Sequence, residues 1–90
     1  MIELIFTKQA LKESERVPSR AREKLGSSLE LLRDDPFHPL LHTKPLTQNL
    51  SGYYSFRITR EWRVIFEFLD PHNIKILSIG HRKEAYKKIK

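Results

Sequence analysis

The stretch SFRITREWRVIFEFLDPHNIKILSIGHRKEAY, from Ser55 to Tyr86, decides the fold of this chain. Apolar and polar residues alternate along it, which is the pattern of half-buried β-strands. The predicted strands cover residues 53–59, 62–69 and 74–80. Residues 59–61 (TRE) are few enough for a hairpin, and residues 70–73 (DPHN) are of the types that favour a tight turn. The three strands therefore form an antiparallel meander.

The alternation assigns these residues to two faces of the sheet. The face expected to meet the core carries Tyr54, Phe56, Ile58, Trp62, Val64, Phe66 and Phe68. In the last strand, Ile74, Ile76 and Ser78 are expected to point away from Lys75, Leu77 and Ile79. The opposite face carries Ser55, Arg57 and Arg63, and Arg82 directly follows the last strand. Because neighbouring strands lie about 4.8 Å apart, the three arginines can converge on one phosphate.

The first half of the chain is predicted to form a strand and two helices. Residues 2–6 (IELIF) are an apolar strand, and Thr7 is a candidate cap for a helix over residues 8–17. Pro18 breaks that helix, and Ser19 is expected to cap a second one. Ala10, Leu11 and Ser14 lie at helical spacing in the first helix. The second helix has apolar residues at helical spacing, namely Ala21, Leu25, Leu29 and Leu32.

The second helix is expected to end at residues 34–36 (DDP), because a residue before proline is pushed out of the α region. A proline-containing loop follows, and Gly52 permits a tight entry into the next strand. The element order is β-α-α-β-β-β. It predicts one α+β domain over residues 1–90, with an antiparallel sheet and two N-terminal helices packed on one face.

Composition restricts the possible functions. The chain of 90 residues has no cysteine, which suits a reducing cytosol and leaves no thiolate for a zinc site. Its apolar runs are too short to span a bilayer, and the N-terminus has no basic region typical of a signal peptide. Of the net charge of +6, residues 1–45 contribute 8 − 7 = +1 and residues 46–90 contribute 9 − 4 = +5. A one-sided basic surface favours a nucleic-acid partner, although an acidic protein partner also fits.

The ordered set of these features resembles the RelE/ParE superfamily of toxins from bacterial toxin–antitoxin systems, over essentially the whole chain. The residues that carry the resemblance are K-P-L-T-Q-N-L-S-G at 44–52, Y-Y-S-F-R-I-T-R-E-W-R-V-I-F at 53–66 and I-G-H-R-K-E-A-Y at 79–86. The resemblance implies a cytoplasmic ribonuclease that binds the ribosome and cleaves mRNA there without a metal. It also implies a cognate antitoxin and a toxin–antitoxin hetero-oligomer. One branch, the ParE-like proteins, acts on DNA gyrase instead, and the His-Arg-Lys-x-x-Tyr ending favours the ribonuclease branch.

Cleavage of RNA without a metal requires a base for the ribose 2′-OH, an acid for the leaving 5′-oxygen and cations for the phosphate. Arg57, Arg63 and Arg82 are the candidate phosphate ligands. The base candidates are Lys44, Glu61 and His81, and Tyr86 or Arg82 is the candidate acid. Further RNA contacts are expected from Arg60, Trp62, Lys83 and Lys87. The His and acidic residues show no metal-site spacing, so no metal or cofactor is expected. A basic module that binds RNA without cutting it remains an alternative.

Overall fold

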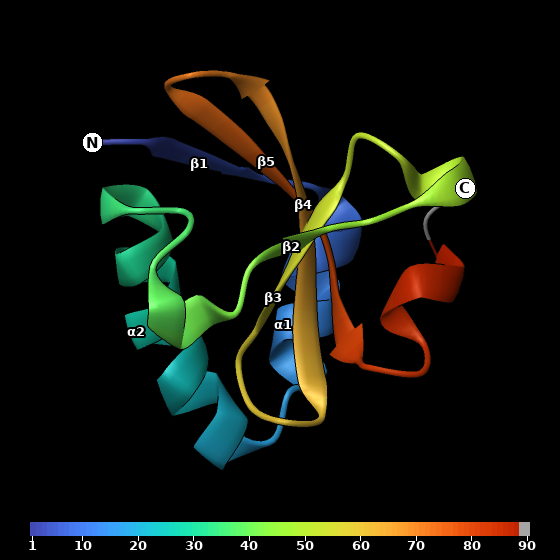
Figure 1. The fold of residues 1–90 in the computed structure, drawn as a ribbon. Coiled ribbons are helices and arrows are strands. Elements are labelled where there is room, and N and C mark those ends of the chain that lie inside the picture. The colour runs from blue at the N-terminus through green and yellow to red at the C-terminus, as the bar shows by residue number, and fades with distance from the viewer. Residues whose placement is uncertain (89–90) are drawn as a thin grey trace.

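Five strands form one sheet in the order β1-β5-β4-β3-β2, and two helices pack behind it in the computed structural model, which describes residues 1–88 (Figure 1). The strands are β1 (Glu3–Phe6), β2 (Lys44–Pro45), β3 (Tyr54–Arg57), β4 (Trp62–Asp70) and β5 (Asn73–His81). The helices are α1 (Lys8–Arg16) and α2 (Ser19–Asp34), and short 3₁₀ turns are η1 (Pro39–Leu41), η2 (Gln48–Leu50) and η3 (Ala85–Lys88). The predicted α+β class, the meander and the two N-terminal helices are confirmed.

The direction of β1 and the number of strands differ from the prediction. β1 pairs in parallel with β5, from Glu3 opposite Asn73 to Phe6 opposite Ile76, so the sheet is not wholly antiparallel. The long connection through α1 and α2 allows either direction, and an apolar run does not specify its pairing partner. β2 was expected to be part of a loop. Its two residues are too few to show a period, but they pair with β3.

The faces of β5 were also predicted wrongly beyond its middle. Ile65 pairs with Ser78 and Phe66 pairs with Ile76, so Leu77 is an extra residue that forms a bulge. The bulge reverses the alternation for the rest of the strand. Ile79 is therefore buried in the same core as Ile74 and Ile76.

Because β1 ends at Phe6, the edge of β5 beyond this point has no neighbouring strand, and side chains at the start of α1 bond its polar groups instead. The Thr7 hydroxyl donates to the Leu77 carbonyl at 3.1 Å, and its oxygen accepts from the Ala10 amide at 3.0 Å, which confirms Thr7 as the cap. Further along α1, Glu13 Oε1 accepts from the Ile79 amide at 3.0 Å and from the Ser78 hydroxyl at 3.1 Å. These side chains replace the missing strand partner.

Helix α1 therefore buries the carboxylate of Glu13, a position that the apolar periodicity of the sequence does not assign to the core. Its buried residues are Ala10 and Glu13, while Leu11 is 53% exposed, contrary to its assigned core position. Helix α2 buries Ala21, Leu25 and Leu32 as predicted, and Leu29 is partly buried. It begins at Ser19 itself, with Pro18 as the residue before it and no side-chain cap, so the capping role assigned to Ser19 is wrong.

The core lies between the helices and one face of the sheet, centred on Phe56, Val64 and Phe66, all fully buried. Gly52 has φ of +98°, which only glycine adopts readily, so its expected role at the strand entry is confirmed. No helix among residues 1–88 is long and apolar enough to cross a membrane. The helices cover one face of the sheet and leave the end of the other face for side chains from β2, β3, β4 and the C-terminal segment.

Candidate nucleic-acid interface

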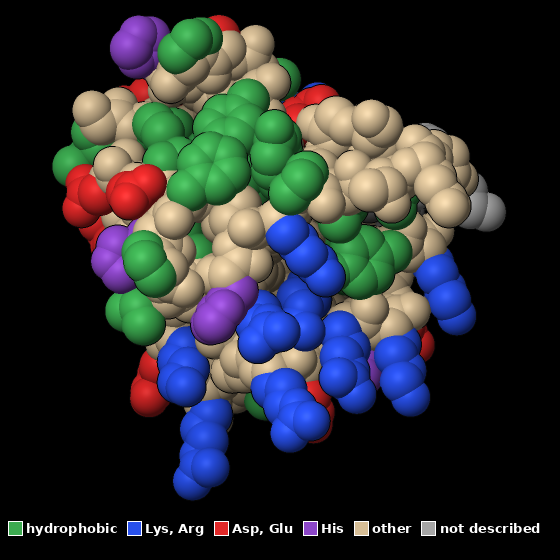
Figure 2. All heavy atoms as spheres, viewed as in Figure 1, with side chains coloured by type: hydrophobic (Ala, Val, Ile, Leu, Met, Phe, Trp, Pro, Cys, Tyr) green, Lys and Arg blue, Asp and Glu red, His purple; other side chains and the backbone are tan. Residues whose placement is uncertain are grey.

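Arg57 and Arg63 lie opposite each other on β3 and β4, on the face of the sheet away from the core. Figure 2 shows Lys and Arg side chains gathered on the lower half of the face where β2 and β3 lie in front. Arg57 and Arg82 are exposed at this end of the molecule. The pKa of Arg63 is lowered first by burial and then by repulsion from the like charges of Arg57 and Arg82. The three arginines expected to bind phosphate are thus brought together by the sheet.

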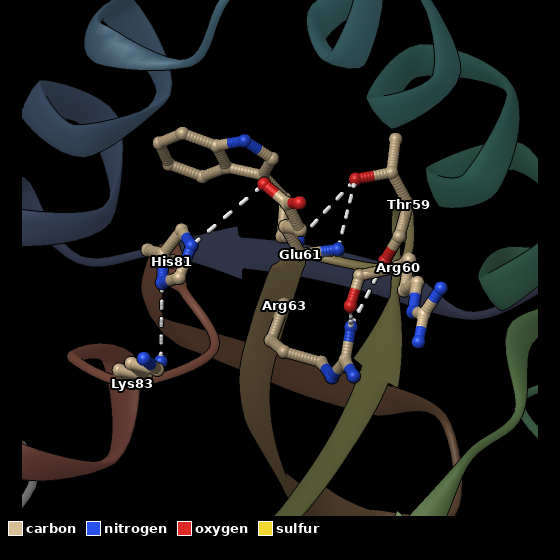
Figure 3. A network of polar contacts seen from close by, with 7 residues as sticks. Thr59, Arg60, Glu61, Arg63, His81 and Lys83 are labelled. Atoms are coloured by element: carbon tan, nitrogen blue, oxygen red, sulfur yellow. Dashed lines mark hydrogen bonds and ion pairs between the residues drawn. The ribbon is translucent and has the colours of Figure 1, made fainter.

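Arg63 differs from the other two because it is buried, with 8% of its surface exposed. Its Nη1 donates to the carbonyl of Thr59 at 2.9 Å and to that of Arg60 at 2.6 Å, so the guanidinium closes the β3–β4 hairpin (Figure 3). Burial lowers the pKa of Arg63 most, Arg57 lowers it further, and Tyr86 raises it. Arginine stays protonated even so, which makes Arg63 a fixed cation with donors left for another group.

Tyr86 reaches this cluster from η3. The Arg82 amide donates to the Glu61 carbonyl at 2.7 Å, and the Lys87 amide donates to the Glu84 carbonyl at 3.0 Å, which bends the chain back over the sheet. The Tyr86 hydroxyl then lies 3.4 Å from the Ser55 hydroxyl on β3. The predicted acid candidate is therefore beside the arginines.

Of the three base candidates, only Lys44 lies on this face. It pairs with Ser55 across β2 and β3, and opposite residues of an antiparallel pair point to the same side. Lys44 is exposed, so its amine is free to approach a ligand above Ser55.

His81 and Glu61 lie on the other side of the sheet end from the Arg63 side chain (Figure 3). His81 is the strand partner of Trp62. The indole and imidazole rings meet edge-on, with their centroids 6.0 Å apart, and the indole also packs against the core. The His81 Nε2 lies 3.8 Å from Glu61 Oε2, and its Nδ1 accepts from the Lys83 amide at 3.3 Å. The three side chains form a separate group, and His81 and Trp62 line a recess of about 150 Å³ together with Glu13 and Arg16.

The bulge at Leu77 explains this separation. Under strict alternation from Phe66 opposite Ile76, Ile79 would lie opposite Arg63, and His81 would follow on the same face of the sheet as Arg63. The extra residue makes His81 the partner of Trp62, on the core side, and places Gly80 rather than Ile79 opposite Arg63.

The other residues expected to bind RNA surround this end of the molecule. Arg60 in the hairpin, and Lys83 and Lys87 in the C-terminal segment, are exposed. Two residues with no recognisable signal in the sequence also shape the site: Ala85 is fully buried, and its atoms lie 3.6 Å from where a side chain on Gly80 would begin. Among residues 1–88, no group of three or more His, Asp or Glu is arranged to hold a metal ion.

A sequence model of the family described as "ParE toxin of type II toxin-antitoxin system, parDE" matches residues 4–86. No curated protein matches the chain at a significant level. The fold is similar to the YoeB/ParE toxin from Agrobacterium tumefaciens, with a TM-score of 0.77, 24% identity, and 90% of this chain and 99% of that chain covered. It is also similar to the toxin–antitoxin complex RelBE2 from Mycobacterium tuberculosis, with a TM-score of 0.68, 27% identity, and 90% of this chain and 98% of that chain covered. For the YoeB–YefM complex from Staphylococcus aureus the TM-score is 0.72 and the identity 25%, with 89% of this chain and 95% of that chain covered.

Proposed function

The chain belongs to the RelE/ParE family of type II toxin–antitoxin toxins, and from that premise we propose that it is a metal-independent endoribonuclease that cleaves mRNA on the ribosome. The observation that carries the proposal is the cluster of Arg57, Arg63, Arg82 and Tyr86 on one open face of the sheet. Guanidinium groups bind phosphate oxygens in pairs and stabilise the charge that develops there during transfer.

In the proposed reaction, the ribose 2′-oxygen attacks the neighbouring phosphorus while a base takes the 2′ proton. The bond from phosphorus to the 5′-oxygen breaks, and an acid gives that oxygen a proton. The products are a 2′,3′-cyclic phosphate and a 5′-OH end. Arg63, held by the hairpin carbonyls, fixes the position of the phosphate, and the exposed Arg57 and Arg82 close on it.

Lys44 is the proposed base, and Tyr86 the proposed acid. Lys44 shares the face of Ser55 and Tyr86, whereas the carboxylate of Glu61 and the imidazole of His81 are directed to the other side of the sheet end. A lysine amine takes the 2′ proton only in its uncharged form. The His81 group is then available for contacts with flanking RNA.

The test is induction of the protein in bacteria, followed by mapping of mRNA ends. Wild type should arrest growth and cut mRNA within translated regions, and the Arg82→Ala/Tyr86→Ala variant should do neither. Arg20→Ala/Lys24→Ala, which removes two exposed cations from the outer surface of α2, is the control that should remain toxic. Full toxicity of the Arg82/Tyr86 variant would contradict the nuclease assignment.

A second candidate function is inhibition of DNA gyrase, which the ParE description of the matching family favours. That activity predicts DNA breaks and an SOS response while mRNA stays intact. The same induction experiment separates the two functions, because RNA ends and DNA breaks are measured on the same cells. RNA binding without either lesion would identify a basic binding module.

A cognate antitoxin is the proposed partner, with the ribosome and mRNA as targets. Two of the similar structures, from Mycobacterium tuberculosis and Staphylococcus aureus, are toxin–antitoxin complexes. An antitoxin for this chain should carry an acidic segment, because the proposed active face holds several exposed cations. Co-expression of the neighbouring reading frame should abolish toxicity and yield a co-purifying complex.

A further inference from the structure

Ser55 is the one residue of β3 that is both polar and buried, with 1% of its surface exposed. It lies at the centre of the proposed site, between its strand partners Lys44 on β2 and Ile65 on β4. A buried hydroxyl is costly unless it has a hydrogen-bond partner. The partner in this structure is the Tyr86 hydroxyl, which donates to the Ser55 oxygen at 3.4 Å from 31 residues away in the sequence.

The segment that carries Tyr86 is docked independently of this bond. Ala85 is fully buried over Gly80, and a β-carbon placed on Gly80 would lie 3.6 Å from Ala85, which is ordinary contact distance. The amide of Arg82 is also bonded to the carbonyl of Glu61 at 2.7 Å. The backbone of η3 is therefore placed by Gly80, Ala85 and Arg82, and the phenol oxygen meets two further groups, the Ser55 hydroxyl and the Arg63 guanidinium.

We propose that Ser55 is a positioning residue that holds the Tyr86 hydroxyl beside Arg63, at the point where the leaving oxygen of RNA receives its proton. The inference rests on the proposed nuclease function. At 3.4 Å the bond is long, so the phenol can turn its proton towards the leaving oxygen of bound RNA while the Ser55 hydroxyl donates to the phenol oxygen in its place. Ser55 itself exchanges no proton with the substrate, and its effect passes through Tyr86.

The test uses four variants in a translation extract, with the rate of cleavage measured on saturating ribosome–mRNA complexes. Ser55→Ala should lower this rate about five- to tenfold, the equivalent of one lost hydrogen bond, with little change in KM. Ser55→Thr keeps the hydroxyl and should restore most of the rate. Tyr86→Phe and Ser55→Ala/Tyr86→Phe should be equally slow, because Ser55 acts only through the phenol.

Ser78→Ala is the matched control. Ser78 is a fully buried serine whose hydroxyl is bonded to Glu13 at the edge of β5, so the variant removes a similar group away from Tyr86. Its cleavage rate should stay close to that of wild type. If Ser55→Ala were as fast as wild type, or if it slowed Tyr86→Phe by the same factor as it slows wild type, the positioning role would be wrong.

A measurement on the free protein separates failure of this inference from failure of the nuclease function. The chain has three tyrosines, so ring-labelled tyrosine gives few NMR signals, and Tyr86→Phe identifies the one from Tyr86. Ser55→Ala should shift that signal, Ser55→Thr should restore it, and Ser78→Ala should leave it in place. A wild-type protein that cuts no RNA would refute the nuclease function, while an unshifted Tyr86 signal in Ser55→Ala would refute the contact itself.

Discussion

Replacement of Glu13 by alanine should strongly destabilise the protein, although the residue lies on a helix of mostly charged, exposed positions. Glu13 is 5% exposed, and its Oε1 accepts from the Ile79 amide and the Ser78 hydroxyl, both in residues that are at most 1% exposed. A buried donor left without a partner costs about 1–3 kcal/mol, so two cost about 2–6 kcal/mol. Water can enter from the recess beside Glu13, which places the expected loss near the lower end, at about 2–3 kcal/mol.

Urea unfolding followed by circular dichroism measures this loss, which is a large share of the roughly 5–15 kcal/mol expected for a small domain. Glu15→Ala is the control, because Glu15 is an exposed glutamate on the same helix, and it should change stability by less than about 0.5 kcal/mol. Glu13→Gln keeps one acceptor oxygen and should lose less than Glu13→Ala. Equal unfolding free energies for Glu13→Ala and Glu15→Ala would refute the account of the β5 edge.

Three further predictions concern the site and the β4–β5 turn. Lys44→Met should slow RNA cleavage about 100-fold or more if Lys44 is the base, whereas His81→Gln should slow it less than tenfold, and the reverse order of the two rates would exclude Lys44. Arg57→Ala and Arg82→Ala should each reduce the steepness of log affinity for single-stranded RNA against log salt concentration by about 0.7, because each removes one phosphate contact. The melting temperature should not change. An unchanged slope would exclude that residue from the interface. Asp70 accepts from the His72 amide and the Asn73 side chain, and these bonds lower the pKa of its carboxyl. Its stabilising effect is therefore present above the unfolded pKa of about 4 and is lost as the pH falls through the lower pKa of the folded state. Unfolding from pH 6 to pH 2.5 should therefore show a smaller acid loss in Asp70→Ala than in wild type, and identical profiles would contradict the contribution of Asp70.

The site combines one immobile cation with several mobile ones. Arg63 is held by two carbonyls of the hairpin, so its side chain has little freedom left to lose in the proposed complex with phosphate. Arg57 and Arg82 are exposed, and they can adjust to the position of the RNA. Arg63→Lys should therefore be a poor replacement, because an ammonium group lacks the planar fork that reaches both carbonyls and a ligand at once.

The sequence alone determined the meander, both hairpin connections and the end of α2. These features depend on local rules: alternation with a period of two, turn-forming residues at 70–73, and a proline after residue 35. It also placed Arg57 and Arg63 on one face, because a hairpin of known length fixes which residues lie opposite each other.

Only the tertiary structure decided which of the candidate residues meet. One extra residue at Leu77 turns His81 to the side of Trp62, and no local preference marks that bulge in the sequence. The parallel pairing of β1, the burial of Glu13 and the docking of Ala85 on Gly80 likewise depend on contacts between distant segments. Periodicity reports the face of each residue within one regular strand. The contacts between strands, and the bulges that adjust them, are set by the packing of the whole chain.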